Sequence, residues 1–89
     1  MDLTDLRAEI DCIDDELVRL FVRRMKVCAQ VATYKKQHNL PILMPQREHD
    51  KLLDVAQKAG PEMAEYIRNL YTLLFKLSRD YQTNYTEVV

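Results

Sequence analysis

Two basic residues, Arg24 and Lys35, lie on or beside the apolar side of a long helical segment. On a helix they are about 20° apart around the axis and roughly 16 Å apart along it. A cation that faces a protein interior is costly unless an anion meets it. The pair could therefore hold a small anionic molecule between them. Alternatively, Arg24 pairs with a carboxylate of another helix and Lys35 reaches water.

Arg7 borders the same apolar stripe near its N-terminal end. It lies about 25 Å from Arg24 along the helix axis, so no small molecule can touch both residues of one chain. Any binding site that Arg7 serves must therefore belong to a partner subunit. The pattern alone favours a simpler role, an exposed ion pair with Asp11 that is worth roughly a few tenths of a kcal/mol.

Further polar residues border the apolar sides of two later segments. Glu48 lies at the edge of one apolar side, whereas Arg47 points about 100° away from it, as on a solvated face. A glutamate in a first helical turn also suits the helix dipole without any further role. Ser78 and Gln82 could present a hydroxyl and an amide to the interior, or be ordinary boundary residues. The residue pattern leaves both pairs undecided.

A long first helix is predicted to position Arg7, Arg24 and Lys35. Apolar residues recur at steps of three and four along roughly 3–37, with Asp2 or Thr4 as the expected N-cap. Asn39 tolerates a left-handed C-cap, and the residue before Pro41 avoids the helical region, so the helix is expected to end there.

Two more helices are predicted after this break, one from Pro45 to about Lys58 and one from Pro61. Proline suits the first turn of a helix, and Gly60 separates the two segments. No β-pattern, internal repeat or low-complexity segment is present. The sequence therefore predicts an all-α fold in a single domain over residues 1–89.

The length of the first helix carries an argument about assembly. About 35 residues span roughly 50 Å, whereas a compact chain of this size has a diameter of about 30 Å. The apolar stripe continues along most of that length, so something outside the chain must cover it. The sequence predicts an intertwined, homodimeric helical bundle.

Composition argues against several other classes of protein. The 13 basic and 14 acidic residues give a net charge of −1, with no basic stripe for nucleic acid. No apolar run approaches membrane-spanning length, and we expect a cytoplasmic protein without membrane partners. Cys12 and Cys28 lie too far apart on one helix to pair. With His38 and His49 they also lack metal-ligand spacing, so no metal site is expected.

Taken together, these residues resemble the all-helical, AroQ-type chorismate mutases, from about Asp5 to Tyr85. The first helix contains LRAEIDCIDDELVRLFVRRMKVCAQVATYKK, similar to the family's pattern of Leu-Arg, Ile-Asp, Arg-Arg and Lys. PILMPQREHDKLL resembles its Pro, Arg-Glu, Leu segment, and YIRNLYTLLFKLSRDYQ its closing helix with Ser and Gln four apart. Each fragment is unspecific, but their order and spacing together are strong evidence.

The resemblance implies an active site at one end of each subunit's bundle, completed by the partner subunit. Chorismate would be the substrate and prephenate the product, by an intramolecular Claisen rearrangement that needs no cofactor. Arg24 and Arg47 would hold the two carboxylates of chorismate, with Arg7 reaching in from the other chain.

The remaining site residues implied by the resemblance surround the reacting bonds. Lys35 and Gln82 would donate to the ether oxygen, Glu48 would meet the ring hydroxyl, and Ser78 would support a carboxylate. Met44 stands where some family members place an acidic residue. If that position acts through its backbone N–H, methionine weakens substrate binding little. If it acts through a carboxylate, the ring hydroxyl of the substrate is held less well.

Two other functions remain open. Isochorismate pyruvate lyase resembles the mutases in its basic residues, but the residue after the matching arginine is typically apolar there and is Glu48 here. A catalytically inert dimerisation module explains the helices equally well. Arg24 and Lys35 paired with the protein's own carboxylates, with no cavity between them, would favour such a module.

Overall fold

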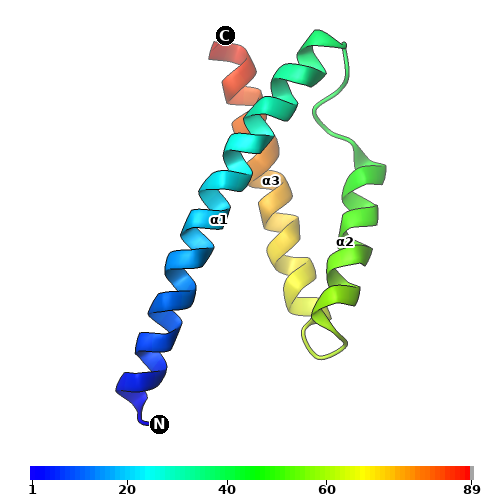
Figure 1. The fold of residues 1–89 in the computed structure, drawn as a ribbon. Coiled ribbons are helices and arrows are strands. Elements are labelled where there is room, and N and C mark those ends of the chain that lie inside the picture. The colour runs from blue at the N-terminus through cyan, green and yellow to red at the C-terminus, as the bar shows by residue number, and fades with distance from the viewer. Residues whose placement is uncertain (89) are drawn as a thin grey trace.

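The chain forms three α-helices in the computed structural model, which describes the backbone of residues 1–88 and the side-chain surroundings of residues 1–84. In chain order they are α1 (Leu3–Gln37), α2 (Pro45–Ala59) and α3 (Ala64–Val88). No β-strand occurs within the described backbone. The all-α fold with a long first helix, predicted from the sequence, is confirmed (Figure 1).

Local hydrogen bonds explain both ends of α1. The Asp2 carboxylate accepts the backbone N–H of Asp5 at 2.9 Å, and the Asp5 carboxylate accepts that of Asp2 at 3.4 Å, which forms a capping box. At the other end Asn39 has a φ of 56°. The Leu40 N–H then donates to the Lys35 carbonyl at 2.8 Å, as in a Schellman motif. The predicted N-cap and left-handed cap residue are both confirmed.

The third helix begins later than predicted. Pro61 does not open it; residues 61–63 form a turn, and α3 begins at Ala64. The turn follows Gly60, which has a φ of 87°, and the Met63 N–H donates to the Gly60 carbonyl at 3.2 Å. This hydrogen bond joins residues three positions apart, as in a 3₁₀-helix, and it precedes the first regular turn of α3. Pro45, in contrast, is the first residue of α2 as predicted.

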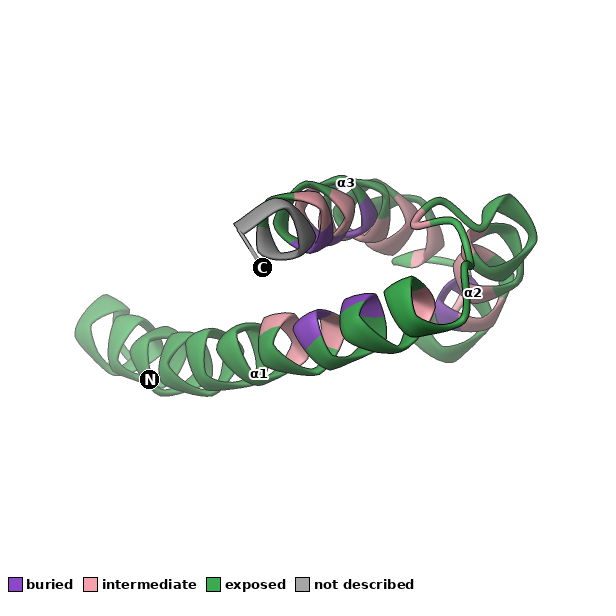
Figure 2. Cartoon of the chain, turned by 90° about the horizontal axis from the view of Figure 1, so that it is seen from above, coloured by how far each residue is buried: buried purple, intermediate pink, exposed green. Residues whose placement is uncertain are grey.

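The helix α3 packs against both α1 and α2. Figure 1 shows α2 and α3 side by side as a hairpin, while the N-terminal half of α1 diverges from both. Residues 1–23 are all exposed, and Figure 2 shows buried positions only on the later turns of α1 and on parts of α2 and α3, where those of α3 lie toward α1. The overall extents are 53 × 28 × 14 Å.

The buried core is small for a chain of this length. Its apolar members are mostly alanines and valine, with one aromatic ring; they are Ala29, Ala32, Val55, Ala56 and Phe75. The radius of gyration is 16.1 Å, against about 12 Å expected for a compact chain of this length. Apolar side chains on the diverging half of α1, such as Ile10 and Leu17, are each more than half exposed. Among the helices that the structure describes, none combines the length and the apolar character that a membrane-spanning helix needs.

Candidate active site

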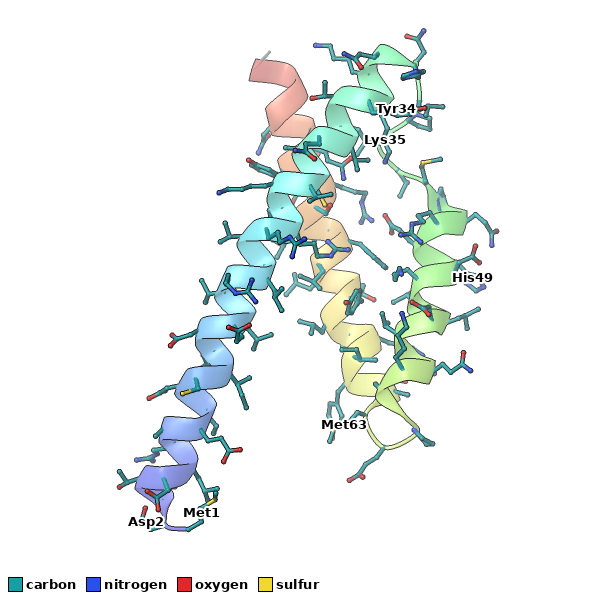
Figure 3. The ribbon with its side chains drawn as sticks, viewed as in Figure 1. Met1, Asp2, Tyr34, Lys35, His49 and Met63 are labelled. Carbon is teal, nitrogen blue, oxygen red and sulfur yellow. The ribbon has the colours of Figure 1, made fainter. Side chains whose placement is uncertain are left out.

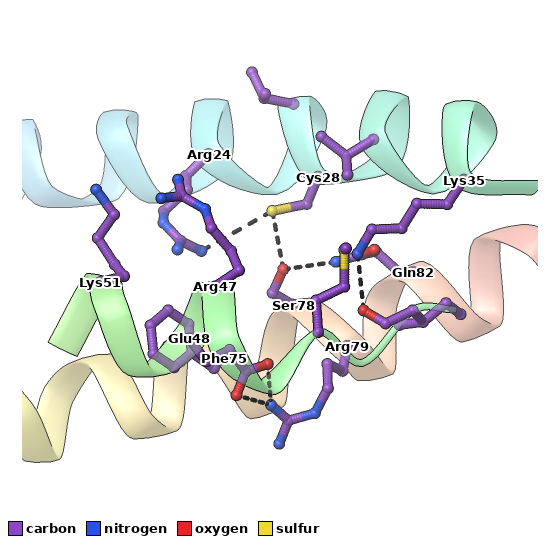
Figure 4. Close-up of a pocket in the computed structure, with 14 residues that line it drawn as sticks. Arg24, Cys28, Lys35, Arg47, Glu48, Lys51, Phe75, Ser78, Arg79 and Gln82 are labelled. Carbon is purple, nitrogen blue, oxygen red and sulfur yellow. Dashed lines mark hydrogen bonds and ion pairs between the residues drawn. The ribbon is translucent and has the colours of Figure 1, made fainter. Parts of the chain in front are cut away.

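A cavity of about 280 Å³ lies between the later turns of α1, the start of α2 and the middle of α3 (Figure 4). Its size suits a small organic molecule. Seven of the eight residues singled out from the sequence line it: Arg24, Lys35, Met44, Arg47, Glu48, Ser78 and Gln82. The fold therefore brings together residues from three separate segments of the chain.

Arg24 is half-buried and points into the cavity. Its guanidinium carbon lies 5.8 Å from the centre of the Tyr71 ring, a cation–π distance. Its Nη1 lies 4.0 Å from Cys28 Sγ. Within the described residues Arg24 makes no ion pair with a carboxylate. Packing against an aromatic ring therefore supports the arginine while its charge stays available to a ligand.

Lys35 reaches from the last turn of α1 toward the connection that leads to α2 (Figures 3 and 4). Its Nζ donates to the carbonyl of Ile42 at 2.8 Å. Burial lowers the pKa of Lys35 below its ordinary value, while interactions with Cys28 and Glu48 oppose that shift. The ammonium is thus held by the backbone of the connection, beside the cavity, with donors left for a bound molecule.

Ser78 and Gln82 lie in the interior, each 6% exposed. Gln82 Nε2 donates to Ser78 Oγ at 3.1 Å, and Ser78 Oγ donates to Cys28 Sγ at 2.9 Å. This chain of hydrogen bonds joins α3 to α1 and fixes the positions of both side chains. Cys28 lies one helical turn after Arg24 and two turns before Lys35, so helical spacing could have identified it as a site residue.

Arg47 and Glu48 both line the cavity, although the helical wheel assigned Arg47 to a solvated face. The exposure of Arg47 agrees with that assignment, but the cavity lies between α1 and α2, and so the side of α2 that faces α1 also lines it. Arg47 remains exposed and, within the described residues, has no carboxylate partner. Its charge is therefore open to a ligand.

Arg79 is a site residue that the sequence analysis missed. Its Nη1 lies 2.6 and 2.5 Å from the two carboxylate oxygens of Glu48, across 31 positions of sequence. A pairing over that separation leaves no periodic signal. Lys51 also lines the cavity and pairs with Asp54 at 3.1 Å; its spacing from Arg47, one helical turn, could have indicated it.

Met44 is the N-cap residue of α2 and makes no side-chain capping bond. Its carbonyl accepts the N–H of Glu48 at 3.2 Å, which begins the helix beside the cavity. Arg7, in contrast, is exposed on the diverging half of α1 and does not line the cavity of its own chain. His49 lies on the side of α2 that faces away from α1 (Figure 3). No group of metal-ligating side chains occurs in the part of the chain that the structure describes.

The charges around the cavity match a ligand with two negative charges. Two of the five lining cations are paired with carboxylates, Arg79 with Glu48 and Lys51 with Asp54. The other three, Arg24, Lys35 and Arg47, have no such partner among the described residues. Guanidinium groups bind carboxylates through two parallel hydrogen bonds. The site can therefore hold a dicarboxylate and place an ammonium beside it.

Comparisons with known proteins agree with this chemistry. The family model described as "Chorismate mutase type II" matches residues 6–83. The chain is 52% identical over 46 residues to a T-protein of Haemophilus influenzae, covering 52% of this chain and 12% of that protein. It is 43% identical over 49 residues to a bifunctional chorismate mutase/prephenate dehydratase of Aquifex aeolicus, covering 55% of this chain and 14% of that protein.

A third relative, a 4-amino-4-deoxychorismate mutase of Streptomyces venezuelae, is 37% identical over 46 residues, which cover 52% of this chain and 45% of that protein. The chain thus spans less than half the length of each of these curated relatives. No solved structure gave a significant match. The family model covers most of the sequence, and the resemblance noted from its motifs is confirmed. The chain belongs to the chorismate mutase type II family.

Proposed function

We propose that this chain catalyses the conversion of chorismate to prephenate, a step of aromatic amino acid biosynthesis. The observation that carries the proposal is the set of three cations without carboxylate partners, Arg24, Lys35 and Arg47, around a cavity of about 280 Å³. Chorismate is a dicarboxylate, and its charge complements this set. Family membership supports the same reaction.

The reaction needs neither a nucleophile nor a proton transfer to carbon, so the protein has two tasks. The first is to hold chorismate in the compact conformer in which the reacting carbons meet. Arg24 and Arg47 grip one carboxylate each, and Ser78 supports one of them. Because the two arginines extend from different helices, they can hold the two carboxylates at a set separation.

The second task is to stabilise the negative charge that develops on the ether oxygen as its bond breaks. Lys35 and Gln82 are the donors that serve this oxygen in our proposal. The Ile42 carbonyl positions the ammonium of Lys35, and Ser78 positions the amide of Gln82, so neither has to reorganise during the reaction. Glu48 accepts a hydrogen bond from the ring hydroxyl, and the Met44 backbone closes that end of the site.

The catalytic assembly in our proposal is a homodimer in which Arg7 completes the partner's site. The diverging half of α1 leaves its apolar stripe uncovered, with Leu17 54% and Ile10 54% exposed. A second copy supplies a matching stripe, and it carries its own Arg7 toward the cavity that the first chain builds. Arg7 then becomes the third arginine that binds the substrate in the partner's site, whereas it cannot reach the site of its own chain.

An inert dimerisation module does not fit the site as well. Such a module would neutralise Arg24 and Lys35 with its own carboxylates, whereas neither has a carboxylate partner in the described residues and a cavity lies between them. The lyase alternative fits less well too, because Glu48 adds a polar acceptor where that enzyme class typically carries an apolar residue.

The test is incubation of the purified chain with each of two substrates. We expect the chain to form prephenate from chorismate, which is measured as a loss of chorismate absorbance. We expect no salicylate or pyruvate from isochorismate. Salicylate and pyruvate as the faster products would assign the lyase reaction instead. Inactivity on both substrates by a folded dimer would favour the inert module.

A further inference from the structure

Arg79 has no part in the reaction as proposed, yet it holds both carboxylate oxygens of Glu48. The side chains of the pair are 32% and 25% exposed. Other ion pairs of α3 join residues three or four apart on the surface; the Arg68 and Glu65 side chains, for example, are 42% and 75% exposed. The Arg79–Glu48 pair instead joins two helices at the cavity wall (Figure 4).

The position of this pair matters because Glu48 is surrounded by cations. Among the lining residues that the structure describes, it is the one carboxylate, against Arg24, Lys35, Arg47 and two others. Burial lowers the pKa of Lys35, and the charge of Glu48 opposes part of that shift by favouring the ammonium. A free carboxylate would be drawn toward the cations that should bind the substrate. Arg79 holds it on the α3 side of the cavity instead.

Arg79 also affects which group of a bound substrate Glu48 can accept, because its positive charge lies beside the carboxylate that faces the substrate ring. A carboxylate that is paired with an arginine can still accept a hydrogen bond from a neutral hydroxyl. For an ammonium in the same place, the attraction of Glu48 is offset by repulsion from Arg79, which is paired with that carboxylate. The name of one relative, 4-amino-4-deoxychorismate mutase, specifies an analogue with an amino group, and an aliphatic amine is protonated at neutral pH.

We propose that Arg79 is a positioning residue that orients and neutralises Glu48, and that it thereby makes the site select a neutral ring hydroxyl over an ammonium at the same ring position. This inference rests on the proposed function, because there Glu48 faces the ring hydroxyl. The inference distinguishes two substrates for this site: chorismate, which carries a hydroxyl, and the amino analogue for which one similar protein is named.

The experiment compares kcat/KM for chorismate and for 4-amino-4-deoxychorismate in the wild-type protein and in Arg79→Met. We expect the ratio of chorismate to amino analogue to fall at least about tenfold in the variant, because the unpaired Glu48 then attracts the ammonium. Arg68→Met is the matched control: it removes an arginine from the surface of the same helix, and it should leave the ratio unchanged.

Two further variants separate positioning from a general effect on stability. Arg79→Lys keeps a cation beside Glu48 and should restore the ratio to within about threefold of wild type. Arg79→Gln removes the charge but keeps a hydrogen-bond donor, so it repeats the test if Arg79→Met does not fold. In a Glu48→Gln background, Arg79→Met should no longer change the ratio, since no carboxylate remains to be held.

Equal losses on both substrates in Arg79→Met would overturn the inference, because they would mean that Arg79 binds a group common to both molecules. A change of the ratio that persists in the Glu48→Gln background would overturn it as well. Failure of the proposed function has a different signature: the wild-type protein itself would not convert chorismate. An unchanged ratio in an active Arg79→Met protein would refute only the role of Arg79.

Discussion

Lys35 shows how the surroundings of one residue can prepare it for catalysis. Its Nζ is held 2.8 Å from the Ile42 carbonyl, and burial lowers the pKa of Lys35. Desolvation raises the energy of the charged ammonium, and a developing negative charge nearby would relieve that cost. In the proposed reaction, a lysine in this environment would therefore interact more strongly with the breaking ether bond than an exposed lysine would.

Lys35→Ala should lower kcat/KM for chorismate by about 10²–10³-fold, the usual effect of removing one preorganised donor. Helix content by circular dichroism and the solution mass should stay unchanged. Lys26→Ala is the control, because Lys26 is an exposed lysine on the same helix and does not line the cavity. Near-native turnover in Lys35→Ala would contradict the assignment of this residue.

The pH dependence of the reaction should report the same ammonium. Lys35 donates only when protonated, so activity should be lost as the pH rises through its pKa. Because burial lowers that pKa from its ordinary 10.5, the loss should begin at a lower pH than for an exposed lysine. A profile of kcat/KM against pH measures it, and the alkaline fall should be absent in Lys35→Arg, since arginine stays charged.

At the scale of elements, the end of α1 determines where Lys35 and the connection meet. Asn39 adopts a φ of 56°, and the Leu40 N–H returns to the Lys35 carbonyl. This cap reverses the chain so that the Ile42 carbonyl lies over the Lys35 side chain. Lys35 thus depends on one left-handed residue, Asn39, for the position of its hydrogen-bond acceptor.

Asn39→Ala should therefore destabilise the protein by about 1 kcal/mol, because alanine adopts the left-handed conformation less readily than asparagine. Asn39→Gly should have an equal or higher free energy of unfolding, since glycine adopts this conformation without a steric cost. Urea denaturation of both variants measures the difference. Equal destabilisation by alanine and glycine would show that the cap conformation does not limit stability.

At the scale of the whole molecule, the extended shape of one chain argues for assembly. A chain with extents of 53 × 28 × 14 Å leaves the first 23 residues exposed along their whole length. The apolar stripe of α1 would remain in contact with water in a monomer, at a cost of about 25 cal/mol for each Å² of apolar surface. The proposed dimer would remove this cost and would also supply Arg7 to each site.

Leu17→Glu should break the dimer and abolish activity, because it places a charge in the middle of the apolar stripe of α1. The matched control is Ala8→Glu, which adds the same charge to the same helix about 160° away from the centre of the stripe. Sedimentation measures the mass, and we expect a dimer for wild type and Ala8→Glu. A Leu17→Glu protein that remains a fully active dimer would contradict the proposed interface.

The sequence by itself determined the secondary structure and the outline of the site. The ends of α1 and the start of α2 were predictable because caps and helical periods depend on residues three or four positions apart. The predicted start of α3 at Pro61 was wrong. Proline suits a first helical turn, but Gly60 has a φ of 87° and a turn follows it, so α3 begins only at Ala64.

Only the tertiary structure decided which residues face the cavity and what holds them. The pairs Arg79–Glu48 and Ser78–Cys28 span 31 and 50 positions of sequence, and no local period encodes contacts over such separations. Arg47 lies on an exposed side of α2 and still lines the cavity, because the cavity extends between α2 and α1, and a wheel of one helix does not contain its neighbours. Periodicity gives the faces of a helix, whereas the packing of neighbouring helices decides which faces meet a ligand.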